Sequence, residues 1–219
     1  MGACRDHPWL TGLAAIVVVV ALVFSQLVGL LIPITVVLLV LVGGLAVVIH
    51  RWLRRRRGAG SSGLIIASAV LATAVVAVGI QAIPYGRAQT NDAVTGEPQW
   101  ADQTTRDLMV RACYDCHSNE VEYPAYASVA PISWAVEFHV SEGREAVNYS
   151  TFTTDRGQAD DSIEVILDGS MPPAYFTRFG LHPEAVLTDA ERDVLVAGLR
   201  NTPGLSEDGG RGRGGDGPR

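Results

Sequence analysis

The first part of the chain is a long apolar run without charged side chains. It extends from Trp9 to Ile49, a stretch of 41 residues, whereas a helix needs only about 20 apolar residues to cross a bilayer. The run therefore predicts two membrane-spanning helices, at about 10–28 and 31–50. Its least apolar points are Ser25 and Pro33, so we expect the turn between the helices to lie between them.

A third apolar run covers residues 64–84, so the region 1–86 is expected to hold three membrane helices. An arginine cluster separates the second run from the third: Arg51, Arg54, Arg55, Arg56 and Arg57. Because cytoplasmic loops are enriched in basic residues, this cluster predicts a cytoplasmic N-terminus and an extracytoplasmic chain after Tyr85. An internal signal peptide is the alternative, but no small-residue cleavage site follows Gln81.

Beyond the apolar region the pattern becomes polar. Residues 87–99 have no periodicity and predict a linker. Residues 100–204 predict a small helical domain, and residues 205–219, rich in Gly and charge, predict a disordered tail. The expected fold is all-α, with three transmembrane helices followed by this domain.

Four helices are expected in the domain. The first leads from Asp102 to Ala112, and the third is the short apolar run from Ser162 to Leu167. The second begins at Ala130-Pro131, since Pro favours the first helical turn, and is expected to end or weaken at Gly143. The last begins at a capping box, Thr188-x-x-Glu191. Its expected apolar face is Ala190, Val194, Leu195 and Leu199.

Cys113-Tyr114-Asp115-Cys116-His117 carries the strongest chemical signal in the chain. It has the Cys-x-x-Cys-His spacing of a c-type haem attachment site. Two thiols on one turn can form thioethers with one porphyrin edge, and the following histidine then lies under the iron as proximal ligand. A redox-active dithiol or half of a zinc site are the alternatives. The preceding residues read as helix rather than strand, and no second Cys or His pair follows at zinc-site spacing, so we expect one covalent haem c.

Met171 is the candidate for the second axial ligand of the iron. It lies in Gly169-Ser170-Met171-Pro172-Pro173, where two prolines stiffen the loop. Met109 lies on the helix that carries the attachment site and is not expected to reach the opposite haem face. His139 and His182 are the alternative ligands, and the choice matters because a His/Met pair raises the reduction potential.

The sequence resembles bacterial haem-binding domain proteins, which are short membrane-anchored c-type cytochromes. The resemblance covers about 81–199 and rests on short motifs around the attachment site and downstream of it: Cys113 to Glu120, Tyr123-Pro124, Ala130 to Trp134, Glu142 to Arg144, Asn148 to Ser150, Gly169 to Pro173, Tyr175, Leu187-Thr188 and Glu191-Arg192. It implies haem attachment at Cys113 and Cys116, proximal ligation by His117 and distal ligation by Met171. Such proteins usually have a single N-terminal anchor, so the two additional expected helices depart from the pattern.

Three further residues are candidate haem contacts: Trp134 and Arg144 as propionate partners, and Tyr175. A haem whose axial positions are both filled by protein exchanges electrons and has no site for a substrate. We therefore expect an electron carrier of the respiratory chain, not an enzyme, on the outer face of the bacterial cytoplasmic membrane. A haem-based redox or gas sensor and an accessory subunit of a membrane respiratory assembly are the alternatives.

Charge indicates the kind of partner. Residues 87–204 contain 19 acidic and 8 basic side chains. Such a surface attracts basic patches on a redox partner protein, or it only keeps the domain soluble. The expected partners are a redox protein, possibly within a membrane respiratory complex, and the lipid bilayer. No nucleic acid is expected.

Overall fold

The structure is a computed structural model that describes residues 16–23, 32–57, 62–153 and 155–205. Within these ranges it is all-helical and contains no strand. The chain divides into two compact units, which are described separately below. The first unit is Met1–Pro84 with Val129–Ala135, and the second unit is Tyr85–Ser128 with Val136–Arg219.

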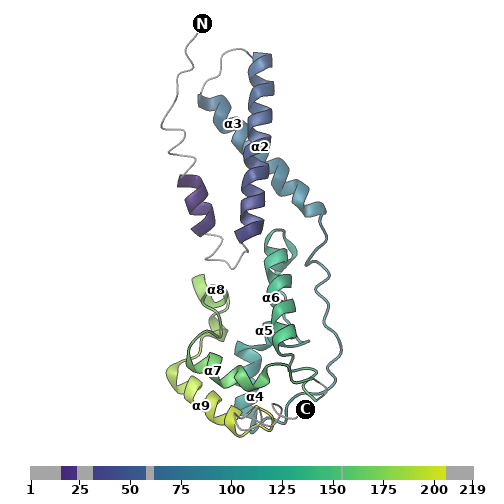
Figure 1. Ribbon diagram of the computed structural model, residues 1–219, viewed down its shortest axis with the longest axis vertical. Coiled ribbons are helices and arrows are strands. Elements are labelled where there is room, and N and C mark those ends of the chain that lie inside the picture. Colours follow the sequence, from purple (N-terminus) through teal and green to yellow (C-terminus); the bar gives the residue numbers. More distant parts are fainter. Residues whose placement is uncertain (1–15, 24–31, 58–61, 154, 206–219) are drawn as a thin grey trace, which may run out of the picture. The chain divides into compact units, whose positions relative to one another are not determined.

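The first unit is built on two long apolar helices. Helix α2 spans Ile32–Arg57 and α3 spans Ser62–Gly79, and they pack against each other as a helical hairpin (Figure 1). Helix α2 begins one residue before Pro33, a position in the first turn where the missing N–H costs nothing. A short 3₁₀ turn, Ile80–Ala82, continues α3.

Two helices in the described part of the chain are long and apolar enough to cross a membrane, not the expected three. Of the expected helix at 10–28, only residues 16–23 are described, and these are helical. The expected turn between Ser25 and Pro33 falls largely outside the described residues.

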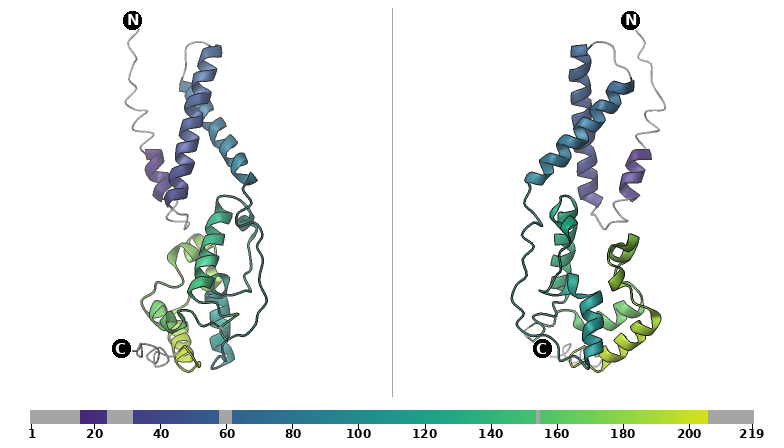
Figure 2. Two further views of the ribbon diagram at one scale, coloured as in Figure 1. Left: turned by 45° about the vertical axis from the view of Figure 1, so that its right-hand side comes forward. Right: turned by 180° about the vertical axis from the view of Figure 1, so that it is seen from behind.

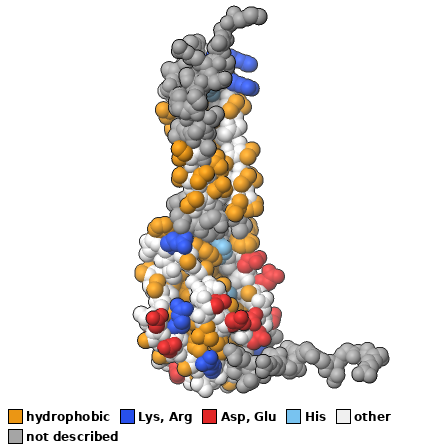
Figure 3. Space-filling view, turned by 60° about the vertical axis from the view of Figure 1, so that its left-hand side comes forward, with side chains coloured by type: hydrophobic (Ala, Val, Ile, Leu, Met, Phe, Trp, Pro, Cys, Tyr) orange, Lys and Arg blue, Asp and Glu red, His pale blue; other side chains and the backbone are white. Residues whose placement is uncertain are grey.

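The side chains of α2 and α3 explain why this hairpin suits a bilayer. Val40, Ile66 and Val78 are 67%, 64% and 73% exposed, and hydrophobic side chains cover the helices in Figure 3. Polar side chains on α3 are satisfied within the helix, because Ser68 Oγ donates to the Leu64 carbonyl at 2.7 Å. An apolar surface of this extent is unusual on a protein that faces only water, so the hairpin is compatible with membrane anchoring.

The second unit is a cluster of short helices joined by loops. Figure 2 shows α4, α7 and α9 gathered at one end of this unit, where α4 and α7 both pack against α9. The α-helices with residues in this unit are α4 (Gln103–Ala112), α5 (Tyr114–His117), α6 (Ile132–Ala146), α7 (Ser162–Leu167), α8 (Ala174–Thr177) and α9 (Asp189–Arg200). Four 3₁₀ turns lie between them: η2 (Ala125–Ser128), η3 (Ala159–Asp161), η4 (Arg178–Gly180) and η5 (Pro183–Ala185).

Side-chain caps fix where the first and last of these helices begin. The Asp102 carboxylate accepts a hydrogen bond from the Thr105 N–H at 2.7 Å at the start of α4. The predicted capping box is confirmed at α9, where Thr188 Oγ1 accepts from the Glu191 N–H and the Glu191 carboxylate accepts from the Thr188 N–H. Each cap satisfies donors that a helix end otherwise leaves unpaired.

The expected apolar face of α9 was partly wrong. Leu195 and Leu199 are fully buried, as expected, but Val194 is 47% exposed and Val196 is buried in its place. The reason is the position of α4, which packs on α9 at Gly198, where a Cβ atom would collide with the Thr105 side chain. The buried face of α9 is therefore Leu195, Val196, Gly198 and Leu199, whereas Ala190 and Val194, expected on that face, are exposed.

The segment 87–99, expected to be a linker, belongs to the second unit and is hydrogen-bonded to other parts of it. Asn91 Nδ2 donates to the Val121 carbonyl at 3.1 Å, and the Asn91 side-chain oxygen accepts from the Val121 N–H at 3.3 Å. The N–H groups of Thr95 and Gly96 both donate to the Ser150 carbonyl. These contacts use side-chain amides and backbone groups, which leave no hydrophobic periodicity in the sequence. The expected tail after Leu205 lies outside the described residues.

Candidate functional site

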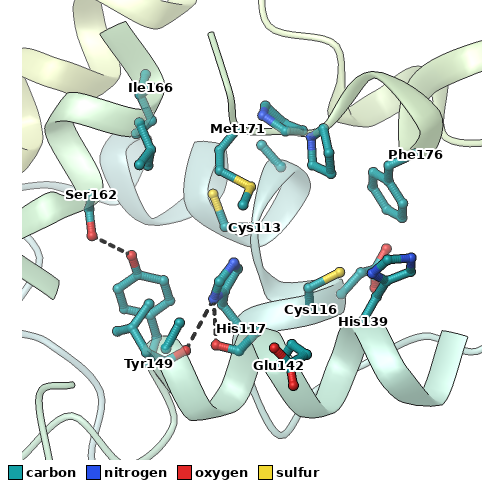
Figure 4. Close-up of a pocket in the computed structure, with 18 of the residues that line it drawn as sticks. Cys113, Cys116, His117, His139, Glu142, Tyr149, Ser162, Ile166, Met171 and Phe176 are labelled. Atoms are coloured by element: carbon teal, nitrogen blue, oxygen red, sulfur yellow. Dashed lines mark hydrogen bonds between the residues drawn. The ribbon is translucent and has the colours of Figure 1, made fainter. Parts of the chain in front are cut away.

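A cavity of about 290 Å³ lies in the second unit. Its walls come from the end of α4, from α5, α6, α7 and α8, and from the loop before α8. Figure 4 shows the thiols of Cys113 and Cys116, the ring of His117 and the side chain of Met171 around this cavity. The structure thus gathers four of the residues that the sequence singled out, although Met171 is far from the others along the chain.

The two thiols enter the cavity from one tight turn. Cys113 ends α4 and precedes α5, and its carbonyl accepts hydrogen bonds from the N–H groups of Cys116 and His117 at 3.1 and 2.9 Å. Both cysteines are free thiols. The turn therefore presents two unlinked sulfur atoms and an imidazole to the same cavity.

Burial makes these thiols poor nucleophiles. It raises the pKa of Cys113 to about 12, and the neighbouring Cys116 adds to the effect. Burial likewise raises the pKa of Cys116 to about 12. Redox-active dithiols work through a lowered thiol pKa, so this environment argues against the dithiol interpretation. Among the described residues, the three-ligand cluster that could hold a metal ion is Asp115, His182 and Glu184, which includes neither thiol.

His117 is held in one tautomer by the backbone of α6 and the residue that follows it. Its Nδ1 lies 2.8 Å from the Gly143 carbonyl and 3.2 Å from the Val147 carbonyl. A carbonyl only accepts, so Nδ1 carries the proton and Nε2 keeps a free lone pair. Burial also lowers the pKa of His117. A neutral imidazole with a free Nε2 is the form that binds a metal.

Gly143 makes this arrangement possible. A Cβ atom at this position would lie 2.5 Å from the Cys116 carbonyl oxygen, so only glycine allows α6 to approach α5 this closely. The expectation that the helix ends at Gly143 was wrong, because α6 continues through it to Ala146. The residue is selected by the contact between helices rather than by a helix end.

Tyr149 forms the wall behind His117. Its ring centroid lies 6.3 Å from that of His117 and 6.1 Å from that of Tyr114, with which it is stacked. Its hydroxyl is hydrogen-bonded to Ser162 Oγ at 2.8 Å. Tyr149 and Ser162 both line the cavity and are buried. The sequence placed Tyr149 in a motif of the family resemblance but gave neither residue a role, because their spacing along the chain does not relate them to the Cys-x-x-Cys-His motif.

Met171 reaches the cavity from a loop that is fixed at its backbone. The Met171 N–H and the Ser170 hydroxyl both donate to the Val165 carbonyl, at 3.0 and 3.2 Å. Gly169, with φ of +76°, makes the turn that leads from α7 into this loop. The hydrogen bonds and the two prolines after Met171 hold the thioether at the cavity.

The alternative ligands differ in where they lie. His139 lines the cavity, with its Nδ1 3.1 Å from the Tyr175 hydroxyl and its ring stacked on Tyr175 at 4.6 Å, so it remains an alternative to Met171. His182 does not line it, and its Nε2 is hydrogen-bonded to the Tyr126 hydroxyl at 2.7 Å. Met109 is fully buried in the core and does not line the cavity either.

Of the three further candidate contacts, Tyr175 lines the cavity, whereas Trp134 and Arg144 do not. Arg144 is instead hydrogen-bonded to two other segments of the chain. Its Nε donates to the Ser118 carbonyl at 2.8 Å, and a terminal nitrogen donates to the Asn91 side-chain oxygen at 2.9 Å. Trp134 belongs to the segment of α6 that is part of the first unit.

The donors around the cavity fit a haem. Two neutral thiols on one turn, an imidazole with a free Nε2 and a thioether from a separate loop are the groups that hold a porphyrin and its iron in c-type sites. Most of the remaining lining is apolar, with Val147, Val165, Ile166 and Phe176 among it. Such a lining suits the flat, apolar body of a porphyrin.

Comparison with protein families shows that a family described as haem-binding domain matches residues 75–201, more than half of the chain. No curated protein and no solved structure matches.

Proposed function

Because this chain belongs to the haem-binding domain family, we propose that it is a membrane-anchored c-type cytochrome that carries single electrons. The observation that carries the proposal is the hydrogen bonding of His117, whose Nδ1 faces two backbone carbonyls while Cys113 and Cys116 share its cavity. When bound, haem c supplies a reversible one-electron iron couple.

Each residue of the cavity has a distinct role in this proposal. Cys113 and Cys116 would hold the porphyrin through thioethers, and His117 Nε2 would bind the iron. Met171 would supply a second iron ligand from its fixed loop. A haem held by two protein ligands would exchange electrons and leave no position for a substrate, which favours a carrier over an enzyme.

We further propose that α2 and α3 anchor the haem domain to the bacterial cytoplasmic membrane. The cluster Arg51 and Arg54 to Arg57 lies on the last turns of α2, at the connection to α3. The positive-inside rule puts that connection in the cytoplasm and the second unit outside. Bacteria attach c-type haem on that outer side, so the arginine cluster and the attachment motif support the same topology.

The acidic surface of the second unit supports the proposal that the redox partner docks through a basic patch. On the face shown in Figure 3, Asp and Glu side chains gather over the second unit. Electrostatic steering by such a surface raises the association rate at low ionic strength. A respiratory complex with a basic docking patch is the partner class that fits.

The experiment that tests the proposal is spectroscopy on the full chain, matured in a host with c-haem machinery and purified in detergent. Haem that stays on the chain after denaturing electrophoresis would demonstrate the thioethers. Absorption spectra of oxidised, reduced and carbon monoxide-treated protein would then identify the axial ligands. We expect a sulfur-to-iron charge-transfer band in the oxidised protein that Met171→Ala abolishes.

Control variants separate the alternatives. His182→Gln should keep the sulfur-to-iron band, because its ring is bonded to Tyr126 and lies outside the cavity. A chain that is isolated without covalent haem would overturn the proposal. Ready binding of carbon monoxide by the reduced wild type would instead favour the sensor, in which Met171 is displaced by a gas.

A further inference from the structure

A second cluster of ligand-type side chains lies beside the haem cavity. Asp115, from the attachment turn, faces His182 and Glu184, from the loop around η5, and their ligand atoms all lie within 4.8 Å of one another. Glu184 Oε1 is 3.2 Å and Asp115 Oδ2 is 3.9 Å from the same atom, Nδ1 of His182. Two carboxylates therefore converge on one imidazole nitrogen.

The other groups around His182 fix its ring with Nδ1 towards the carboxylates. The Tyr126 hydroxyl is hydrogen-bonded to Nε2 at 2.7 Å, and the ring of Phe176 is stacked on the imidazole at 3.9 Å with an interplanar angle of 10°. A metal-bound histidine typically uses its second nitrogen in this way, since an outer hydrogen bond fixes the ring orientation and the tautomer. In the metal-bound form Nε2–H would donate to Tyr126.

The Asp115 carboxylate has one oxygen that is available to bind an ion. The Glu122 N–H donates to Asp115 Oδ1 at 3.2 Å, which fixes that side chain. Its other oxygen, Oδ2, is too far from Nδ1 for a direct hydrogen bond. Glu122 and Glu184 both act on Asp115 as like charges, so negative charge is concentrated on this side of the cluster. A divalent cation would offset this excess of negative charge.

We propose that Asp115, His182 and Glu184 form a binding site for a zinc-class divalent cation, with water completing the coordination. Ligand atoms about 2.0–2.2 Å from a tetrahedral ion lie roughly 3.3–3.6 Å apart, close to the 3.2 Å between His182 Nδ1 and Glu184 Oε1. The 3.9 Å between His182 Nδ1 and Asp115 Oδ2 has to shorten by about half an ångström to match. One imidazole with two carboxylates suits Zn²⁺ and its neighbours better than Mg²⁺ or Ca²⁺.

The site would join two segments that are far apart in the sequence. Asp115 lies between the two haem-binding cysteines, and His182 follows the loop that carries Met171. A bound cation would therefore tie the attachment turn to the distal side of the cavity. The proposal does not depend on haem, because its three ligands are separate from Cys113, Cys116, His117 and Met171.

The test is a titration of the full chain, purified without a histidine tag and freed of metal with a chelator. ZnCl₂ binding is followed by calorimetry, and CoCl₂ is followed through its visible d–d bands. We expect one ion per chain with nitrogen and oxygen ligation. Asp115→Asn and His182→Gln should each weaken binding at least tenfold, whereas Glu164→Gln, an exposed carboxylate on α7, should not change it.

Tyr126→Phe tests whether the cluster is a specific metal site or a chance grouping of ligand-type side chains. It removes only the hydroxyl that orients His182, and the loss of such an outer partner typically weakens metal affinity by about 10–100-fold. Binding that is equal in wild type, Asp115→Asn and His182→Gln would overturn the proposal, as would the absence of binding at millimolar ZnCl₂. An intense sulfur-to-cobalt charge-transfer band would also overturn it, since the ion would then be held by the cysteines.

Discussion

The carbonyl of Gly143 accepts a hydrogen bond from Nδ1 of His117 at 2.8 Å, across 26 residues of sequence. The same glycine leaves room for the Cys116 carbonyl, which a Cβ atom would approach to 2.5 Å. One residue of α6 therefore sets both the distance of that helix from the attachment turn and the orientation of the imidazole.

Gly143→Ala should destabilise the second unit and reduce haem incorporation. The new methyl group would meet backbone rather than a flexible side chain, so α5 and α6 have to move apart, at a cost of about 1–3 kcal/mol typical of overpacking. Haem content per chain and the denaturant midpoint measure the two effects. Gly43→Ala, where a Cβ atom meets nothing within 4 Å, is the matched control. Equal haem content in the two variants would contradict the role assigned to Gly143.

Tyr149→Phe should lower the free energy of unfolding by about 1–2 kcal/mol, because Ser162 Oγ loses its buried partner. The ring against His117 remains, so the absorption spectrum should stay that of wild type. Denaturant unfolding of Tyr149→Phe, Ser162→Ala and the double variant forms a thermodynamic cycle. Additive effects in that cycle would mean that the two hydroxyls do not interact.

In a haem-free chain that carries Cys4→Ser, the thiols of Cys113 and Cys116 should react slowly when the chain is folded. Burial raises the pKa of Cys113 and Cys116 from 9.0 to about 12, so at pH 8 the thiolate fraction is on the order of a thousandfold smaller than in unfolded chain. Alkylation by iodoacetamide, with and without denaturant, measures the ratio, and the rate in folded chain should rise about tenfold per pH unit from pH 8 to 11. Equal rates in both conditions would show that the cavity forms only around haem.

Acid should weaken the contact between α9 and α4 through Glu191. Hydrogen bonds from Thr188 and Arg111 lower the pKa of Glu191 from 4.5 to about 2. A lowered folded-state pKa gives stability that is present above pH 4.5 and is lost as the pH falls towards 2. Urea midpoints between pH 2 and 6 should therefore fall less steeply for Glu191→Gln than for wild type. Parallel curves would show that Glu191 contributes nothing in this window.

The parts of the fold that follow from local spacing could be predicted from the sequence. The Cys-x-x-Cys-His turn, the capping box at Thr188 and the bounds of α7 depend on residues a few positions apart, and the structure shows them as expected. Met171 could be proposed because few residue types bind haem iron and its loop is stiffened by prolines.

The parts that depend on contacts between distant segments could not be predicted. Gly143 was interpreted as a helix end because its meaning lies in the Cys116 carbonyl, which only the folded chain brings near. Arg144 was expected at a propionate, but it holds the Ser118 carbonyl and Asn91. Val194 and Val196 differ in burial because α4 and α7 pack on one side of α9, and periodicity alone does not identify that side.

The side-chain amide of Asn91 forms two hydrogen bonds with the backbone of Val121, 30 residues away along the chain. These bonds close a loop that contains α4 and the Cys-x-x-Cys-His turn. A closed loop has fewer conformations open to it than a free one, so an asparagine in the segment 87–99 helps to order the turn that carries both cysteines.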